Sequence, residues 1–256
     1  MRFSIITPTY KRAEKLARAV RSVQNQTHRD WELIIVNDSP SDTSYHHFAS
    51  TINDPRIHYY VNDTNKGVNY SRNRALDKVS VASDWIIFLD DDDYLSPDAL
   101  ATFRELITNN ANHSWFITNR ALINGTPLTQ APRSDTQYSY IWHYLFLRQL
   151  KGDVTHAIET KKILRIRFPI HIKQGEEWFF FYQLGISEKM FYHDHNSTIT
   201  DGYADSGLNF RKRTYSEQLE TLSVLFYEAA LRGFAYRSTF LTYLFIRLLR
   251  ILIRKK

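Results

Sequence analysis

The sequence contains no cysteine among its 256 residues. A disulfide, a thiolate nucleophile and a zinc site with sulfur ligands are therefore excluded. Glycine is sparse, with 8 residues, and no G-x-G-x-x-G or P-loop pattern occurs, so the common glycine-rich phosphate-binding loops are absent. The first residues lack the long apolar core of a secretory signal peptide. Together these absences lead us to expect a cytoplasmic protein.

The positive charge of the chain is confined to one end. Residues 1–202 carry 23 lysines and arginines and 23 aspartates and glutamates, whereas residues 203–256 carry 10 and 4. The formal net charge of +6 therefore lies wholly in the final segment. A neutral body argues against a nucleic-acid-binding face, and a basic tail points to an anionic surface.

Apolar runs alternate with helical patterns from the first residues onward, which is the signature of βαβ units. A hydrophobic content of 43% and an aromatic content of 14% are sufficient for a well-filled core. We expect strands over residues 3–6, 31–36, 56–61 and 85–89, and helices over residues 16–26, 68–79 and 97–109. Each strand is followed by a polar loop, and such loops can gather at one edge of the sheet.

Four consecutive carboxylates, Asp90 to Asp93, directly follow the apolar strand pattern of residues 85–89. Adjacent negative charges repel, so the run needs a cation, strong hydrogen bonds or open solvent. Hard oxygen ligands suit Mg²⁺ or Mn²⁺, which in turn bind phosphate oxygens. Open α/β sheets bind their ligands at this carboxyl edge. The alternative is a solvated acidic loop before the helix that starts near Pro97.

Four segments follow one another in an informative order, and they lie at residues 4–10, 33–42, 65–73 and 88–97. In this order they resemble the opening strand and turn, the DxSxD turn, the N-x-G…aRN segment and the DxD motif of inverting family 2 glycosyltransferases of the GT-A fold. The resemblance is closest over residues 3–100 and extends to about residue 200. It implies an α/β GT-A domain over residues 1–202 with a mainly parallel central sheet. Residues 1–93 would form the nucleotide-binding half, residues 94–202 the acceptor half, and residues 203–256 a basic helical tail.

The resemblance assigns the donor site to residues at the strand ends. Asp38 matches the aspartate that accepts a hydrogen bond from the nucleotide base, and the alternative for it is an ordinary Asx turn. Asp92 and Asp90 match the DxD pair, which implies Mn²⁺ or Mg²⁺ bound by Asp92 and the metal or the ribose bound by Asp90. Asp91 fills the variable position of the motif. The expected nucleotide-sugar contacts are completed by Thr7, Pro8, Tyr10, Lys66 and Arg72, although Arg72 could equally be a surface arginine of a helix.

A second acidic pair, Glu176 and Glu177, resembles the "Gly-Glu-Asp" segment that supplies the catalytic base in this family. The match points to Glu177, but a glutamate replaces the commoner aspartate, so the choice between Glu176 and Glu177 stays open. The alternative is that both acids only favour a helix N-terminus. His195 resembles a histidine that binds the metal or the diphosphate, and the alternative for it is a structural role in a strand.

Two segments outside these motifs have a distinctive composition. Residues 137–150 are rich in aromatic side chains, which favours a core-packing helix over a sugar-stacking or membrane-facing lip. Residues 238–256 place Arg247, Arg250 and Arg254 on one arc of an otherwise apolar helix. This pattern predicts a helix that lies in a membrane interface, with its arginines on anionic headgroups. The alternative is a helix packed on the body with a basic outer stripe.

The function implied by the resemblance is that of a metal-dependent inverting glycosyltransferase. It would move a sugar from a nucleotide diphosphate donor, in the first place a UDP-sugar, to a glycan or glycolipid acceptor. Lipopolysaccharide core, capsule and lipid-linked oligosaccharide are the expected acceptors, and the inner face of the cytoplasmic membrane is the expected location. One alternative is a sugar-phosphate nucleotidyltransferase, but residues 7–10 lack the glycines such an enzyme needs. A non-catalytic adaptor of a glycan-assembly complex is the other.

Overall fold

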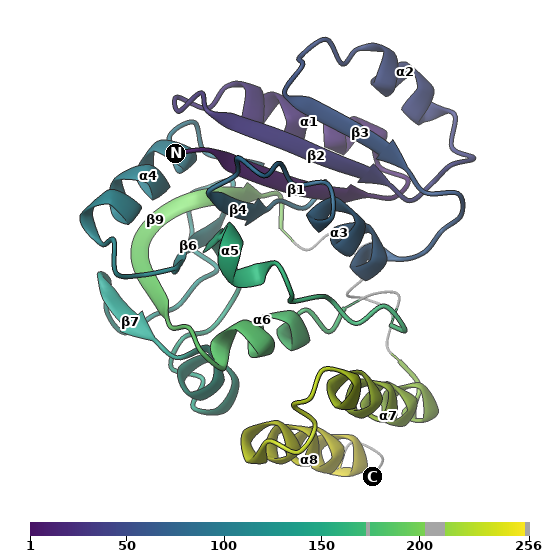
Figure 1. Ribbon diagram of the computed structural model, residues 1–256, viewed down its shortest axis with the longest axis vertical. Coiled ribbons are helices and arrows are strands. Elements are labelled where there is room, and N and C mark those ends of the chain that lie inside the picture. Colours follow the sequence, from purple (N-terminus) through teal and green to yellow (C-terminus); the bar gives the residue numbers. More distant parts are fainter. Residues whose placement is uncertain (173–174, 203–212, 254–256) are drawn as a thin grey trace.

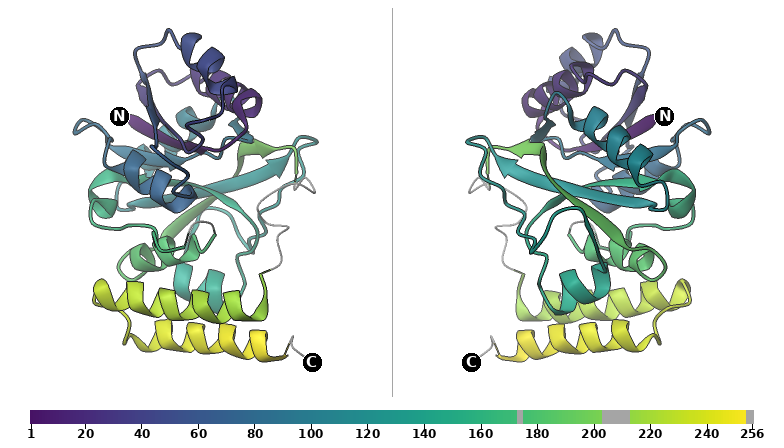
Figure 2. Two further views of the ribbon diagram at one scale, coloured as in Figure 1. Left: turned by 90° about the vertical axis from the view of Figure 1, so that its right-hand side faces the viewer. Right: turned by 90° about the vertical axis from the view of Figure 1, so that its left-hand side faces the viewer.

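The computed structural model describes residues 1–172, 175–202 and 213–253. They form an α/β body around a single mixed sheet, with two long C-terminal helices side by side at one end of it (Figures 1 and 2). The sheet order is β3-β2-β1-β4-β8-β6-β9-β5, and β7 pairs with β9 outside this path.

The first half of the chain builds the parallel part of the sheet from β1 (Phe3–Thr9), β2 (Trp31–Asn37), β3 (Ile57–Val61) and β4 (Trp85–Phe88). The connecting helices are α1 (Ala13–Gln24), α2 (Ser44–Ser50) and α3 (Val68–Leu76). All four predicted strands are confirmed. The first one runs further than expected, through Thr9, because its pairing with β2 continues to Asn37. Pro8 is tolerated there because the pairing of β1 with β4 has already ended at Ile6.

The second half of the chain adds strands of both directions. They are β5 (Asp93–Leu95), β6 (Trp115–Leu122), β7 (Thr136–Tyr138), β8 (Val154–Glu159) and β9 (Met190–Thr200). The helices of this half are α4 (Ala99–Asn109), α5 (Thr160–Ile163) and α6 (Trp178–Gly185). β8 enters the sheet between β4 and β6 and is antiparallel to both. The predicted α/β class is confirmed, whereas the sequence pattern did not predict this antiparallel strand.

Apolar side chains leave the sheet on both faces, so the core has two layers. Phe3 and Ile5 of β1 pack with Leu16 of α1 and Phe103 of α4 in one buried cluster. Ile6, on the opposite face of the same strand, belongs to a second cluster with α6 and the C-terminal helices. Burial of both faces explains why the parallel strands are continuous apolar runs rather than alternating ones.

The aromatic segment 137–150 forms β7 followed by a π-helix, η1 (Tyr140–Phe146). Tyr138, Tyr140, Ile141 and Leu145 are buried, so the prediction of a core-packing segment is confirmed. Trp142 is exposed on the outer side of η1. The sequence pattern predicted a helix here, but it did not predict that the helix is of the π type.

The two C-terminal helices, α7 (Tyr215–Leu231) and α8 (Ser238–Ile253), pack on each other and on the body. Leu225 of α7 and Phe240 of α8 are buried in the same apolar cluster as Ile6 of the sheet. The inner face of α8 therefore follows the alternative of a packed helix. No helix in the described part of the chain is long and apolar enough to cross a membrane.

The predicted arc of three exposed arginines on the last helix is wrong for Arg247. This side chain turns inward and forms an ion pair with Glu176 instead of facing solvent. Arg250 is exposed, and Arg254 lies outside the described residues. Packing of Phe240 fixes the rotation of the helix, and that rotation carries Arg247 toward the body.

Candidate active site

The parallel strands β1, β2 and β4 end at the same edge of the sheet, and the predicted donor residues follow these ends. Strand direction alone therefore brings the residues after Thr9, Asn37 and Phe88 together. The carboxyl edge is the common ligand-binding edge of such sheets.

Asp38 lies at this edge but is already occupied by donors from the protein. It is buried, and its Oδ1 accepts hydrogen bonds from Asn62 Nδ2 at 2.7 Å and from the backbone N–H of Lys66 at 2.8 Å. Its Oδ2 accepts from the backbone N–H of Gly67 at 2.7 Å. These bonds hold the turn that leads into α3. A carboxylate can accept about four hydrogen bonds, so these three leave one acceptor position on Oδ2. Recognition of a nucleotide base by Asp38 remains a prediction.

The residues expected to contact the nucleotide from the first strand are divided between interior and surface. Thr7 and Pro8 are buried within β1, and the hydroxyl of Thr7 has no hydrogen-bond partner in the described part of the chain. Tyr10 and the side chain of Lys66 are exposed beside the same edge. Tyr10 and Lys66 are therefore the residues of this set that are accessible to a ligand.

The four carboxylates after β4 alternate between buried and accessible. Asp90 and Asp92 have side chains that are 36% and 32% exposed, whereas those of Asp91 and Asp93 are 7% and 2% exposed. Asp91 and Asp92 form a turn, which is closed by a hydrogen bond from the backbone N–H of Asp93 to the carbonyl oxygen of Asp90 at 3.2 Å. Asp90 and Asp92, the residues predicted as the DxD pair, are the more accessible members of the run.

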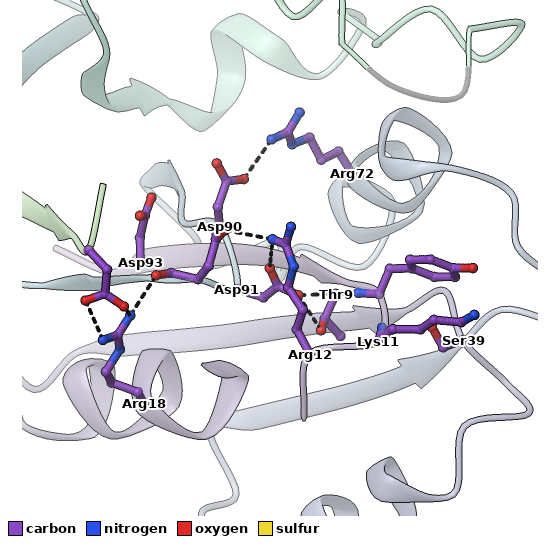
Figure 3. Close-up of polar contacts among 12 residues, drawn as sticks. Thr9, Lys11, Arg12, Arg18, Ser39, Arg72, Asp90, Asp91 and Asp93 are labelled. Carbon is purple, nitrogen blue, oxygen red and sulfur yellow. Dashed lines mark hydrogen bonds and ion pairs between the residues drawn. The ribbon is translucent and has the colours of Figure 1, made fainter. Parts of the chain in front are cut away.

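Asp91 holds the loop after β1 rather than facing the site. Its Oδ2 accepts hydrogen bonds from Thr9 Oγ1 at 2.7 Å and Tyr10 N at 3.3 Å, and Arg12 lies 3.2 Å from its Oδ1 (Figure 3). Burial raises the pKa of Asp91 to about 6 in spite of these donors. The predicted nucleotide-sugar contact of Asp91 is therefore not supported by its surroundings, because the side chain is enclosed by protein groups.

Asp93 is the most enclosed of the four and forms an ion pair with Arg120 of β6. Burial raises the pKa of Asp93 to about 7, because the charge of Arg120 offsets the loss of solvation only in part. Its Oδ1 is buried without a hydrogen-bond partner in the described residues. Arg120 was not predicted as a site residue, although a charged residue within the apolar pattern of β6 is the signal that could have revealed it.

Asp90 and Asp92 each face a guanidinium group. Arg72 lies 2.8 Å from Asp90 (Figure 3). Arg12 lies 2.7 Å from Asp92. Burial would raise the pKa of Asp90, but the charges of Arg72 and Arg120 outweigh it and hold that pKa below its usual value. Asp90 therefore stays ionised at neutral pH.

Arg72 connects the two acidic motifs of the chain. Its side chain is 6% exposed and donates hydrogen bonds to Asp90 at 2.8 Å and to Glu177 at 2.6 Å. Burial alone would lower the pKa of Arg72, but the two carboxylates raise it, so the group is a permanent cation. The alternative of a solvent-exposed helix arginine is wrong. Because α3 carries Arg72 between the DxD loop and the second acidic pair, one side chain brings both to a single place.

These groups open into one cavity of about 170 Å³. Arg72, Asp90 and Glu177 line it together with a wall of rings, which are Tyr140, Tyr144, His156, Phe168, Trp178 and Phe181. Carboxylates beside aromatic faces suit a sugar, because hydroxyls bind the former and C–H faces pack on the latter. Of this lining the sequence pattern identified Arg72, Asp90 and Glu177, and it gave a sugar-stacking lip as the alternative for the segment 137–150. The other rings of the wall come from segments far apart in the chain and were not predicted.

His156 is a further polar group of this cavity that the sequence did not reveal. Trp115 Nε1 donates a hydrogen bond to its Nδ1 at 3.0 Å, and the imidazole stacks on Phe181. Burial lowers the pKa of His156 to about 3, so the ring is neutral. Since Nδ1 accepts a hydrogen bond, the ring proton is on Nε2, where it is a donor rather than a base.

Glu176 and Glu177 are adjacent but lie in opposite surroundings. Glu176 is 5% exposed and accepts hydrogen bonds from Arg213 at 2.7 Å, Arg247 at 3.0 Å and Trp178 Nε1 at 2.6 Å. Burial would raise its pKa, but Arg247, Trp178 and Arg213 lower it to about 2. Glu177 is 48% exposed, lines the cavity and contacts Arg72. Glu177 is therefore the member of the pair that can reach a substrate.

The residues predicted to bind a metal are only partly brought together. Asp90 and Asp92 supply hard oxygen donors two residues apart, which fits a Mg²⁺ or Mn²⁺ ion bound by one or two carboxylates and by phosphate oxygens. No group of three histidines, aspartates or glutamates with metal-binding geometry exists among the described residues. His195 lies 2.9 Å from Ser197 Oγ and 3.3 Å from Asp98 Oδ2, so the structure gives it other partners.

The fold and the cavity define a glycosyltransferase of the GT-A type. The structure of S. aureus TarS residues 1-349 in complex with UDP-GlcNAc has the same fold, with a TM-score of 0.69 over 89% of this chain and 66% of that chain, at 17% sequence identity. The model of "Glycosyl transferase family 2" matches residues 4–168. The chain therefore belongs to glycosyltransferase family 2.

Two curated relatives with specific names are bacterial transferases. The GalNAc(5)-diNAcBac-PP-undecaprenol beta-1,3-glucosyltransferase of Campylobacter jejuni is 37% identical over 41% of this chain and 34% of its own length. The UDP-Glc:alpha-D-GlcNAc-diphosphoundecaprenol beta-1,3-glucosyltransferase WfgD of Escherichia coli is 31% identical over 49% of this chain and 48% of its own length. The chain spans between 13% and 65% of the length of eight curated relatives that it matches.

Proposed function

We propose that this protein transfers a sugar from a UDP-sugar to a hydroxyl group of a bacterial surface-glycan acceptor, with inversion at the anomeric carbon. The observation that carries the proposal is Arg72, which joins Asp90 of the DxD motif to Glu177 within one cavity. A donor diphosphate near Asp90 and an acceptor hydroxyl near Glu177 would then be held on either side of the reacting carbon. Such juxtaposition replaces an encounter in solution with a fixed geometry.

Glu177 is the proposed general base. Its carboxylate takes the proton of the acceptor hydroxyl while the acceptor oxygen forms a bond to the anomeric carbon and the bond to the diphosphate breaks. The electron pair of that bond leaves with the nucleotide diphosphate. A positioned base of this kind contributes roughly 10²–10⁴-fold in rate. Arg72, which donates a hydrogen bond to Glu177 at 2.6 Å, orients this carboxylate before the acceptor arrives.

Asp90 and Asp92 are the proposed ligands of a Mg²⁺ or Mn²⁺ ion, and His195 remains a candidate third ligand. When bound, the ion would neutralise the negative charge of the departing diphosphate. Arg12 pairs with Asp92 at 2.7 Å. As a half-buried cation at the strand edge, it is well placed to turn from Asp92 toward a phosphate.

The choice of donor and acceptor is supported by the similar proteins. TarS has been crystallised with UDP-GlcNAc, and the name of the E. coli relative gives UDP-Glc as its donor. The names of both curated relatives specify undecaprenol-diphosphate-linked acceptors. A lipid-linked oligosaccharide is therefore the acceptor class that we favour over lipopolysaccharide core or capsule.

A lipid-linked acceptor requires access to a membrane surface, and α8 offers a face for it. Leu241, Phe245, Leu249 and Leu252 are exposed and recur at helical spacing. Together with the basic excess of residues 203–256, this face fits peripheral docking on anionic lipid at the cytoplasmic side of the membrane. Arg250, rather than Arg247, is the described arginine of α8 that is available to headgroups.

A donor panel tests the proposed reaction. UDP-Glc, UDP-GlcNAc and other nucleotide sugars are offered with an undecaprenol-diphosphate-linked acceptor and Mn²⁺, and product stereochemistry is determined by NMR. We expect one UDP-sugar to be turned over with inversion. Release of pyrophosphate from a nucleoside triphosphate and a sugar phosphate would instead indicate a nucleotidyltransferase. Tight donor binding without turnover of any acceptor would support the adaptor alternative.

Flotation with vesicles tests the membrane proposal. Replacing Phe245 and Leu249 of α8 by glutamine should reduce binding to anionic vesicles, and added salt should weaken the binding of the unchanged protein. Ile123, an exposed residue in the turn after β6, gives the matched control as Ile123→Gln. Equal binding by the α8 variant and the control would contradict docking through α8.

A further inference from the structure

Among its described residues, the segment that carries Glu177 contains no helix or strand. It runs from α5 to α6, and of its residues the structure describes 164–172 and 175–177. A catalytic group on such a segment needs support from outside, because placement within about 0.5 Å is required for efficient chemistry. The described contacts of this segment therefore indicate which parts of the molecule position the proposed base.

Helix α3 holds one side of the segment through two asparagines. Asn69 Nδ2 donates to the carbonyl oxygens of Pro169, Ile172 and Gly175 at 3.1, 2.8 and 3.1 Å. Asn73 exchanges hydrogen bonds with the backbone of Phe168 at 3.0 and 2.9 Å. This side also carries Arg72, so the segment is fastened to the same helix that contacts the proposed base.

The C-terminal helices hold the other side, and they do so at the residue next to Glu177. Arg247 of α8 and Arg213, which precedes α7, both donate to the carboxylate of Glu176. Glu228 of α7 accepts a hydrogen bond from the backbone N–H of His171 at 3.2 Å and contacts its Nδ1 at 2.5 Å. These contacts reach the segment at two separate points.

Helix α8 also packs against the cavity wall. The ring of Trp178 lies 4.7 Å from that of Tyr243 and 6.1 Å from that of Phe240, and the guanidinium of Arg247 lies 5.4 Å from Trp178. Trp178 lines the cavity directly after Glu177. One helix therefore contacts both neighbours of the proposed base.

The backbone geometry of Glu176 shows why its ion pairs with Arg213 and Arg247 are needed. Glu176 has a φ of 63° and Gly175 a φ of 73°, which places both in the left-handed region. A residue with a side chain is disfavoured there, because its Cβ comes too close to the following carbonyl oxygen. Ion pairs with Arg213 and Arg247 provide a stabilisation that can offset this cost. Released from them, the backbone at Glu176 would relax, and the direction of the Glu177 side chain would change with it.

We infer that the α7–α8 pair is part of the active site, because Arg213 and Arg247 position Glu177 by clamping Glu176. They are positioning residues and do not contact the substrate. The inference rests on the proposed function of Glu177 as the base. It also accounts for part of the basic excess near the C-terminus, which the sequence alone assigned to a membrane surface.

Arg247→Met tests the clamp, with Arg237→Met as the matched control. Arg237 immediately precedes α8, is exposed and makes no side-chain hydrogen bond in the described part of the chain. Arg247→Met should lower kcat between about tenfold and a hundredfold, with the donor KM within about twofold of the unchanged protein. Arg247→Lys, which keeps one charged donor, should recover part of the loss. Arg237→Met should leave both constants unchanged.

Two further measurements separate positioning from a general loss of stability. Hydrogen exchange of the amides at 177–181 should accelerate in Arg247→Met, while exchange in β1 and β2 stays as slow as before. Glu176→Gln combined with Arg247→Met should be no worse than the more damaging single change, since both remove one interaction.

The results distinguish the clamp from the proposed function. Unchanged kcat in a folded Arg247→Met variant would overturn the clamp, and so would an equal loss of exchange protection in β1 and in α6. If the unchanged protein transfers no sugar, the proposed function fails. Locally faster exchange at 177–181 would then still show that the arginines hold this segment.

Discussion

The two acidic runs of this protein, Asp90 to Asp93 and Glu176 to Glu177, divide their residues in the same way but stabilise them differently. In each run one accessible member, Asp90 or Glu177, lines the cavity, and the buried members Asp91, Asp93 and Glu176 pair with protein groups. In the aspartate run, the neighbouring donors and cations offset the loss of solvation of the two buried carboxylates only in part. Burial therefore raises the pKa of Asp91 to about 6 and of Asp93 to about 7. In the glutamate pair, hydrogen bonds and positive charge outweigh the loss of solvation of the buried Glu176, and its pKa falls to about 2.

This difference shows what each region contributes to the site. The aspartate run directly follows strand β4, and its carboxylates are contacted by arginines of the α/β body, which are Arg12, Arg72 and Arg120. The glutamate pair lies on an irregular segment and depends on cations supplied by the C-terminal helices. Adjacent acids in a sequence can therefore have unrelated roles, and the partners that surround them decide which role each one takes.

The largest loss of sugar transfer is expected from a change at Asp92, an accessible residue of the aspartate run. Asp92→Asn should abolish sugar transfer, because it removes a negative charge from the proposed cation site at constant volume. EDTA should have the same effect on the unchanged protein, and Mn²⁺ or Mg²⁺ should restore activity. Turnover is measured as UDP release in the presence of acceptor. Full activity of the unchanged protein in chelator would exclude the proposed metal role.

The second effect concerns the accessible member of the glutamate pair. Glu177→Gln should lower kcat by roughly 10²-fold or more, since the amide cannot accept the proton of the acceptor hydroxyl. Donor affinity, measured by calorimetry with UDP, should stay nearly constant because the group acts on the acceptor. A larger kcat loss for Glu176→Gln than for Glu177→Gln would reverse the assignment of the base.

Glu176→Gln should affect stability as well as kcat, which falls when the clamp is released, and we expect a loss of about 3 kcal/mol in the free energy of unfolding near neutral pH. The pKa of Glu176 is lowered from 4.5 to about 2 by folding, so its stabilisation is complete above pH 4.5. It is lost as the pH falls through the window between these values. Urea unfolding at several pH values should therefore show the two proteins converging in acid. A constant difference across that window would contradict the ionised, clamped Glu176.

The smallest effect has the opposite sign and concerns Asp91. Its pKa rises from 3.8 to about 6 on folding, so the folded state binds the proton more tightly and loses stability as the pH rises through this window. Between about pH 5 and pH 8, Asp91→Asn should therefore gain on the order of 1 kcal/mol relative to the unchanged protein. Thermal unfolding at both pH values measures the difference. A relative loss of stability for the variant at high pH would show that the groups around Asp91 fully offset its loss of solvation.

The sequence predicted most of the N-terminal half of the fold and less of the C-terminal half. Strands β1 to β4 were predictable because apolar runs that end in polar turns are local signals. The extension of β1 through Pro8 was not, since it depends on where pairing with β4 stops. The antiparallel insertion of β8 and the π-helical η1 also depend on long-range packing, which no local pattern encodes.

What the sequence determined by itself was the set of chemical groups, with Asp38 and the predicted DxD pair at strand ends and the two glutamates before a helix. Only the tertiary structure decided how these groups are used. Arg72 and Glu177 are separated by 105 residues, and Arg247 and Glu176 by 71, so their ion pairs exist only once the helices have packed. The physical reason is that the pKa and accessibility of a carboxylate depend on burial and neighbouring charge, and both are properties of the folded chain.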